Sequence, residues 1–432
     1  MLLQLKWVIK WFITSLFCLI LVLSCNNKKN INEQKTAIKP DIPAVRGVWL
    51  STVSRLDWPS LSSVNLDSEK LRIEVQKKEL TDKLDNLVKV GINTIFFQVK
   101  PDSTALYRSH ILPWSDVLTS VIGKDPGYDP LTFIIAEAHK RNLKIHAWLN
   151  PYRVSMDMKP ETIASLQKTI SSTLSSVYVL HKDWIRTAYD RFVLDPGLPE
   201  VRNWIISIIT ELIKNYNIDG IHFDDYFYYE TPSSKLNDDT TFQQYGHGFL
   251  DKGSWRRNNI FLLIQEVSST IRSLKSTIEF GISPGGVWRN ISDDPLGSNT
   301  KADGSTYDKA YADTRLWIKE GLLDYIAPQI YWPFARKIAK YDIIAKWWAD
   351  VVRSTNTKLY IGVALYKIGV ASQAEPDWSL NGGVPELKKQ LDLNDQLPEI
   401  KGVILFREGL LQLSQTEEAV KYLRSRWHRS VQ

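Results

Sequence analysis

The chain has 432 residues, of which 44% are hydrophobic and 24% are charged, the balance of a folded protein with a sizeable core. Its formal net charge is +6. However, residues 1–44 hold six lysines against Glu33 and Asp41, which is +4 and leaves +2 for the rest. So small a surplus provides no basic face for nucleic acid, and that partner is excluded.

The first segment of the chain is an export signal. Lys6 and Lys10 precede an apolar run, Trp11–Ser24, which is shorter than the roughly 20 residues that a membrane-spanning helix needs. Such a run is typical of a signal peptide. It ends in Leu-Val-Leu-Ser before Cys25, which resembles a bacterial lipobox and predicts lipidation of Cys25. An ordinary signal peptide cut nearby is the alternative.

Three parts are expected: a signal peptide over 1–24, a lipidated cysteine with a flexible polar tether over 25–44, and one catalytic domain over 45–432. The two cysteines are Cys18 and Cys25, so the mature chain cannot form an internal disulfide. We expect a lipid-anchored protein of the cell envelope that contacts the membrane through its lipid. Asn26 rather than Asp follows the cysteine, which indicates the outer membrane in a Gram-negative cell. A monomer is expected.

Short apolar runs alternate along the domain with longer amphipathic segments, which predicts parallel strands with helical crossovers. The predicted strands are Val45–Val53, Ile92–Val99, Lys144–Leu149, Gly220–Asp224, Glu279–Ser283, Tyr325–Ile330, Leu359–Ala364 and Gly402–Phe406. The predicted helices are Glu69–Val90, Leu131–Arg141, Pro199–Asn215, Ser254–Leu274, Thr314–Gly321, Ile343–Thr355, Pro385–Leu393 and Thr416–Trp427.

This order fits an α/β fold, a single (β/α)8 TIM-type barrel. The alternative is a doubly wound open sheet, but no Gly-x-Gly-x-x-Gly follows an early strand. The connections after strands three and four, residues 150–219 and 226–278, are long, and we expect extra helix in each. Function in this fold is located at the carboxyl ends of the strands.

The fourth strand ends in two adjacent acids, Asp224 and Asp225, followed by Tyr226, Tyr228 and Tyr229. When two carboxyl groups lie close together, the pKa of one of them is raised, so that this group can act as an acid while the other stays ionised. The alternative is that one of them only orders the following loop.

The other strand ends are also polar and aromatic, as a saccharide site requires, and the sixteen tryptophans are compatible with stacking on sugar rings. Candidate substrate-binding residues are Trp49, Gln98, Lys100, Asp102, Trp148, Asn150, Tyr152, Arg153, Tyr226, Trp288, Gln329, Trp332 and Glu408.

Other chemistries have little support. The seven histidines show no His-x-x-x-His pair, and no cysteine ligands remain, so no metal site is predicted. His146 and His222, each inside a predicted strand, are expected to be hydrogen-bonded barrel residues. No Gly-x-Ser-x-Gly elbow or phosphate-binding loop is present, and no cofactor is expected.

Several ordered motifs resemble one family. They include Arg46–Leu50, Phe97–Pro101, Gly127–Leu131, His146–Arg153, Leu194–Gly197, Asp219–Tyr226 and Ala327–Trp332. They are similar to the glycosyl hydrolase-like family 10, over roughly residues 44–425. As a lipoprotein, the chain also resembles the divisome-localised type, which acts on peptidoglycan glycan strands. The resemblance implies a (β/α)8 fold, glycosidase activity and no cofactor.

Two positions depart from the family pattern. Thr104 stands where Asp is expected, two residues after Asp102, and Lys100 stands where Arg is usual. Lysine cannot replace the bidentate contact of arginine, which puts the subsite along the second strand in question.

A second resemblance suggests the mechanism. Adjacent acids on strand four look like the arrangement in hexosaminidases that use the substrate's 2-acetamido group as nucleophile, an exception to the two-carboxylate schemes. Asp224 would orient the acetamide, Asp225 would protonate the leaving oxygen, and Tyr331 would donate to the acetamide oxygen; the order of the two acids stays open. A conventional alternative has Asp224 as nucleophile and Asp225, Glu408 or Asp102 as acid.

The predicted function is therefore hydrolysis of glycosidic bonds in a 2-acetamido-sugar polymer, foremost peptidoglycan. A glycan-binding lipoprotein without activity and a surface glycosidase for another polysaccharide are the alternatives.

Overall fold

The structure, a computed structural model, describes residues 44–168, 174–229, 231 and 233–429. The predicted signal peptide, Cys25 and the tether up to Pro43 lie outside the described residues. No described helix is both long and apolar enough to cross a membrane.

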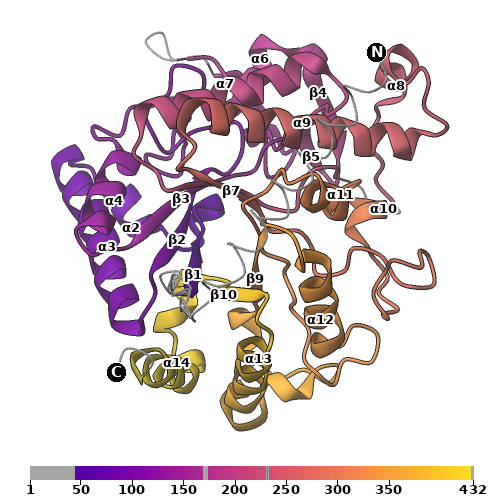
Figure 1. Ribbon diagram of the computed structural model, residues 1–432. Coiled ribbons are helices and arrows are strands. Elements are labelled where there is room, and N and C mark those ends of the chain that lie inside the picture. Colours follow the sequence, from indigo (N-terminus) through magenta and orange to yellow (C-terminus); the bar gives the residue numbers. More distant parts are fainter. Residues whose placement is uncertain (1–43, 169–173, 230, 232, 430–432) are drawn as a thin grey trace, which may run out of the picture. The chain divides into compact units, whose positions relative to one another are not determined.

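Eight parallel strands form a closed barrel (Figure 1) in the order β1-β10-β9-β8-β7-β6-β3-β2. They are β1 (Val45–Leu50), β2 (Thr94–Lys100), β3 (Lys144–Leu149), β6 (Gly220–Phe223), β7 (Glu279–Ile282), β8 (Tyr325–Ile326), β9 (Lys358–Val363) and β10 (Ile400–Leu405). The first and last strands close the ring, with Val48 opposite Leu405. The predicted (β/α)8 barrel is confirmed, and each of the eight predicted runs overlaps one of its strands.

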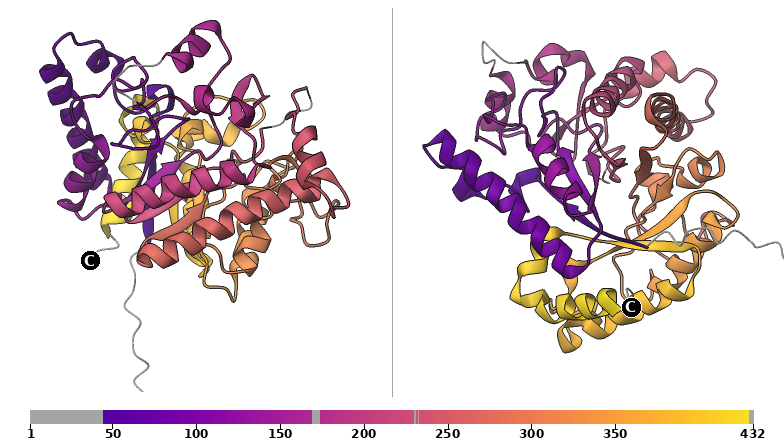
Figure 2. Two further views of the ribbon diagram at one scale, coloured as in Figure 1. Left: turned by 90° about the horizontal axis from the view of Figure 1, so that it is seen from above. Right: turned by 60° about the vertical axis from the view of Figure 1, so that its left-hand side comes forward.

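Helices surround the barrel (Figure 2). One follows each strand: α3 (Glu69–Val90), α4 (Pro130–His139), α7 (Pro199–Asn215), α9 (Lys252–Lys275), α11 (Thr314–Lys319), α12 (Tyr341–Val352), α13 (Val384–Gln396) and α14 (Glu417–Arg429). Short α2 (Leu61–Val64) and α10 (Thr306–Lys309) lie in the connections that precede α3 and α11.

The last helix packs against the first long one. Ser68 caps α3 by accepting a hydrogen bond from the Leu71 amide, and Gly91 ends it in the left-handed conformation with φ 94°. A Cβ atom at Gly91 would lie 3.1 Å from Cβ of Trp427 in α14. Glycine therefore serves both the helix stop and this close approach.

Inside the barrel lies an aromatic cluster that includes Trp49, Phe96 and Tyr325. The Tyr325 hydroxyl is 3.0 Å from Nδ1 of both His146 and His222. Burial lowers the pKa of His146 to about 4 and that of His222 well below its usual range, so both rings are neutral at physiological pH. The prediction that these histidines are hydrogen-bonded barrel residues is confirmed.

The two long connections carry additional elements. After β3 come α5 (Pro160–Gln167), α6 (Val177–Leu180) and an antiparallel hairpin of β4 (Ile185–Ala188) and β5 (Arg191–Leu194); after β6 comes α8 (Asp239–Tyr245). The hairpin was not predicted. Its turn residues, Tyr189 and Asp190, both have φ of 53°. Asn-Gly is the pair that usually adopts this conformation in a hairpin turn, so Tyr-Asp did not indicate one.

Candidate active site

The two acids follow β6 directly, at the carboxyl end of the barrel. Asp224 is buried, with 4% of its surface exposed. Trp148 Nε1 donates to its Oδ2 at 3.2 Å, and Asn150 Nδ2 lies 3.3 and 3.2 Å from its two oxygens. Burial raises the pKa of Asp224, while the Arg153 charge and these donors act to lower it. Three partners thus favour the ionised form of Asp224.

Asp225 has a different environment. It is half-buried, and burial together with the neighbouring Asp224 charge raises its pKa to about 7, against a weaker lowering by a hydrogen bond from Gln329. At neutral pH a large share of Asp225 therefore carries a proton. The two carboxyl groups thus have unequal surroundings, with more partners for the ionised form around Asp224, and such a difference is how carboxyl groups obtain separate roles in glycosidases.

The segment after β8 faces this pair. Pro328 has no N–H and interrupts the ladder, but Gln329 still bridges to Gly285 and Gly362, so the segment continues to the carboxyl end. The Tyr331 hydroxyl is buried and has no hydrogen-bond partner among the described residues. Burial and the nearby Asp225 charge raise the pKa of Tyr331 well above its usual range. The Tyr331 hydroxyl and Arg153 Nε are therefore buried donors of the site that have no partner among the described residues.

A cationic and aromatic wall stands beside Asp224. The Arg153 guanidinium lies 4.8 Å from the ring centroid of Tyr226 and 5.9 Å from that of Tyr229. Tyr226 is 41% exposed, and its ring stacks on Tyr229 at 5.3 Å. Tyr229 also donates to Asn150 Oδ1 at 2.9 Å. Tyr229 stands out in the sequence, in the segment after the acids, but it is not among the predicted candidate binding residues.

Two side chains of the second strand position the loops after β3 and β1. Lys100 is buried and donates to the carbonyl oxygens of Asn150 and Pro151 at 2.8 and 3.3 Å. Burial lowers its pKa to about 7, although the Asp102 charge opposes this. Gln98 accepts from the backbone of Thr52 and Val53 at 3.0 and 2.8 Å. Both side chains are therefore committed to positioning loops.

Four of the candidates make other contacts, and a fifth, Trp332, stays beside Gln329 at the carboxyl end of the barrel. Trp49 is buried in the barrel interior and donates to His222, Tyr152 lies in the main hydrophobic core, and Trp288 donates to Asp313 at 3.2 Å. Trp332 packs beside Gly286, where a Cβ would lie 2.8 Å from its ring. Glu408 is completely buried and pairs with Lys83 of α3 at 2.5 Å. The structure does not bring Glu408 to the acid pair, so it leaves Glu408 no role as the acid.

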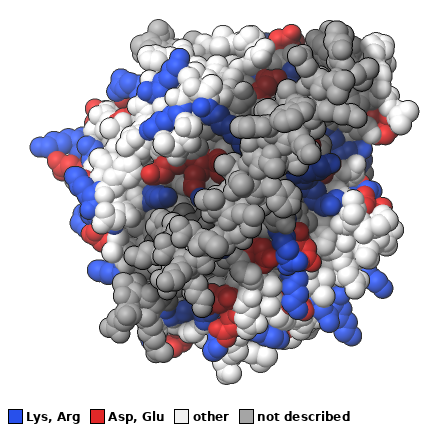
Figure 3. All heavy atoms as spheres, in the orientation of Figure 1, with Lys and Arg blue, Asp and Glu red and all other residues white. Residues whose placement is uncertain are grey.

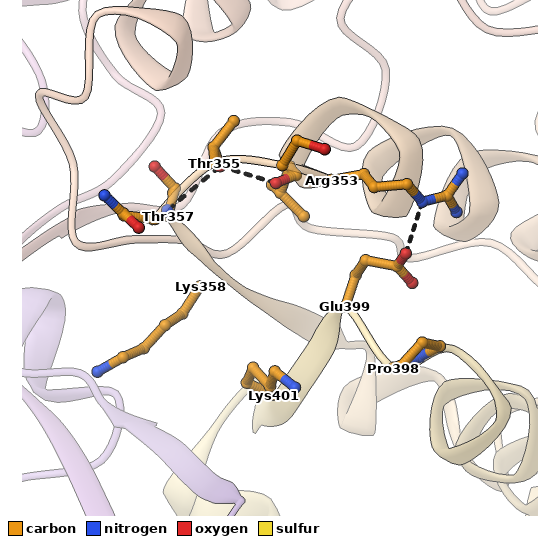
Figure 4. Close-up of a pocket in the computed structure, with 10 residues that line it drawn as sticks. Arg353, Thr355, Thr357, Lys358, Pro398, Glu399 and Lys401 are labelled. Atoms are coloured by element: carbon orange, nitrogen blue, oxygen red, sulfur yellow. Dashed lines mark hydrogen bonds and ion pairs between the residues drawn. The ribbon is translucent and has the colours of Figure 1, made fainter. Parts of the chain in front are cut away.

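A cavity lies at the face of the barrel opposite to the acid pair, where the strands begin (Figure 4). It has a volume of about 300 Å³ and is lined by Arg353, Lys358, Glu399 and Lys401. Lys358 and Lys401 lie at the amino ends of β9 and β10, and Arg353 Nε donates to Glu399 at 2.7 Å. Polar groups at this face of a barrel serve stability rather than chemistry. Among the described residues, no group of three or more His, Cys, Asp or Glu could hold a metal ion.

Comparison with known proteins identifies the family. The model of the family described as "Glycosyl hydrolase-like 10" matches residues 44–380. The chain belongs to this family. It is 62% identical over 383 residues to the protein named glycosyl hydrolase DigH of Escherichia coli K12, covering 89% of this chain and 87% of that protein. It is 43% identical over 366 residues to glycosyl hydrolase YngK of Bacillus subtilis, covering 84% of this chain and 68% of that protein. Membership makes the chain a glycoside hydrolase.

Solved structures agree on the fold. The glycoside hydrolase domain of PgaB from Bordetella bronchiseptica superposes with a TM-score of 0.52 at 13% identity, covering 88% of this chain and 98% of that chain. The β-amylase catalytic domain from Paenibacillus polymyxa superposes with a TM-score of 0.50 at 9% identity, covering 88% of this chain and 97% of that chain. At such identity the likeness concerns the barrel alone.

Proposed function

We propose that this glycosidase cleaves a polymer of 2-acetamido sugars, the glycan strands of peptidoglycan, and that the substrate's acetamido group is the nucleophile. The observation that carries the proposal is the buried Tyr331 hydroxyl, which has no hydrogen-bond partner among the described residues and lies near Asp225, whose charge acts on it. Tyr107 and Tyr152 also carry such hydroxyls, but Tyr331 is the one beside the acid pair, where a ligand oxygen would satisfy it.

The environments of the two acids support separate roles. Asp224, surrounded by Trp148, Asn150 and Arg153, is suited to remain ionised and to accept the acetamide N–H. Asp225, with its pKa near 7, is suited to hold the proton that the leaving oxygen needs. General acids work best when their pKa lies close to the working pH.

The proposed reaction has two steps. The acetamide oxygen attacks the anomeric carbon while Asp225 gives its proton to the departing glycosidic oxygen, and a cyclic oxazolinium forms. Asp224 stabilises the positive charge through the acetamide N–H, and Tyr331 donates to the acetamide oxygen before it attacks. Water then adds at the anomeric carbon and returns a proton to Asp225, which restores the acetamide.

The proposed location is the cell envelope, through a lipid on Cys25. This placement would bring the enzyme to a polymer in which every sugar carries a 2-acetamido group, so that location and mechanism agree. Charged side chains of both signs are interspersed over the face of the molecule shown in Figure 3.

The test is digestion of purified peptidoglycan, with and without stem peptides, by the full chain in detergent and by its Asp225→Asn variant. Mass spectrometry should find soluble muro-oligosaccharides with the wild type alone. Inhibition by a thiazoline analogue of the oxazolinium would support the acetamide route, whereas cleavage that this analogue leaves untouched would favour Asp224 as the nucleophile. Cleavage of other polysaccharides but not of peptidoglycan would contradict the proposed substrate.

A further inference from the structure

A polar cavity opens between the loops that follow β1, β2 and β3, on the same side of the barrel as the acid pair. Its volume is about 480 Å³, and its lining includes Arg55, Asp102, Thr104, Asp116 and Glu161. That volume lies within the range of about 300 to 1,000 Å³ typical of ligand sites. The described part of the chain therefore has a space of ligand size that the acid pair itself does not use.

Arg55 is the cation of this cavity. Its guanidinium forms no hydrogen bond or ion pair with a described residue, although its charge lowers the pKa of Asp116 against the larger effect of burial. Ser54 and Arg55 have φ of 51° and 54°, in the left-handed region that non-glycine residues rarely adopt. The loop thus presents an arginine whose planar donors remain available.

Asp102 presents an acceptor to the same space. Thr104 donates to Asp102 Oδ1 through its amide at 2.9 Å and its hydroxyl at 2.6 Å. Both bonds use Oδ1, so Oδ2 has no hydrogen bond within the described residues. The threonine that departs from the family pattern therefore fixes the carboxyl group of Asp102.

The cavity is connected to the acid pair through the chain itself. Pro101, next to Asp102, accepts a hydrogen bond from Arg153 at 3.1 Å, and Val154, next to Arg153, lines the cavity. Arg153 is also the charge beside Asp224. The segments 101–102 and 153–154 therefore link the surroundings of Asp224 to this cavity, with Arg153 itself buried between them.

We propose that this cavity is a second sugar-binding subsite, in which Arg55, Asp102 and Asp116 bind the hydroxyl and acetamide groups of further residues of the same strand. The inference rests on the proposed function and deepens it. The lining carries four carboxylates, Asp102, Asp116, Asp157 and Glu161, which accept hydrogen bonds from sugar hydroxyl and amide groups, while Arg55 donates to sugar oxygens. A glycan strand supplies both the donors and the acceptors that these groups need. Occupation of this subsite makes the enzyme prefer long strands to short ones.

The experiment compares kcat/KM on peptide-free glycan strands of four and of twelve sugars for the full chain, Arg55→Ala and Arg55→Lys. The ratio of kcat/KM on the long strand to kcat/KM on the short strand measures what the subsite contributes. We expect Arg55→Ala to lower this ratio about tenfold, as loss of a charge-assisted hydrogen bond does, and Arg55→Lys to restore part of it. The matched control is Arg108→Ala, since the Arg108 side chain is 61% exposed and lies 3.7 Å from Asp125, outside the cavity lining.

The outcomes separate the two proposals. A wild type without length preference, or an Arg55→Ala variant that changes both rates equally or neither, would overturn the subsite while the proposed function stands. A wild type that cleaves no strand of any length would overturn the proposed function, and the subsite with it. A changed ratio in Arg108→Ala would show a general effect of surface charge and would also overturn the subsite.

Discussion

Replacing Asp225 by asparagine should stabilise the protein, and the gain should grow with pH. The native pKa of Asp225 is about 7 against a usual value of 3.8, so the folded state binds this proton more tightly than the unfolded state. Stability therefore falls as pH rises from about 4 to about 7. Asparagine has no charge at any pH, so the variant escapes that loss.

The magnitude follows from the same pKa values. One unit is worth about 1.4 kcal/mol, and between pH 5 and pH 8 the unfolded state stays ionised while the native group loses its proton. The free-energy gap between variant and wild type should widen by about 2 to 3 kcal/mol over this range. The lower figure allows for water that reaches a half-buried carboxylate.

Urea unfolding of both proteins at pH 5 and pH 8, followed by circular dichroism and tryptophan fluorescence, measures the gap. Asp303→Asn is the control, because Asp303 is exposed. A gap that is equal at the two pH values, or that narrows at pH 8, would refute the assignment of Asp225 as the protonated member of the pair.

Three further outcomes are expected. For the wild type, kcat/KM should fall tenfold per unit above about pH 7, because Asp225 must carry its proton; a profile flat to pH 9 would contradict this. Tyr331→Phe should lower kcat roughly 10- to 100-fold without lowering the melting temperature, since its buried hydroxyl has no partner to lose. Glu408→Gln should destabilise the fold by about 3 kcal/mol by leaving Lys83 unpaired and should leave kcat unchanged; denaturant unfolding and kinetics check both.

Local signals explain why the barrel could be predicted. The bounds of α3 and α7 match the prediction, because Ser68 and Gly91 mark the ends of α3 and Pro199 marks the start of α7. The β4–β5 hairpin could not be found in the same way, since Tyr189 and Asp190 give no glycine signal at the turn.

The site was predictable where residues follow a strand directly. Asp224, Asn150 and Arg153 come together because parallel strands bring their carboxyl ends to one side of the barrel. Glu408 also follows a strand, but its partner Lys83 is 325 residues away, and such a pairing has no trace in local sequence. The direction of an individual side chain is decided by packing across the fold.

The way the ring closes has a consequence for synthesis. Strand β1 pairs with β2 along one edge and with β10 along the other. The ribosome synthesises β10 about 350 residues after β1. At roughly 5 to 20 residues per second, the edge of β1 that pairs with β10 stays unpaired for roughly 20 to 70 seconds. An exposed strand edge invites pairing with other chains. The nascent protein therefore depends on staying unfolded, or on a chaperone that covers this edge, until its final strand emerges.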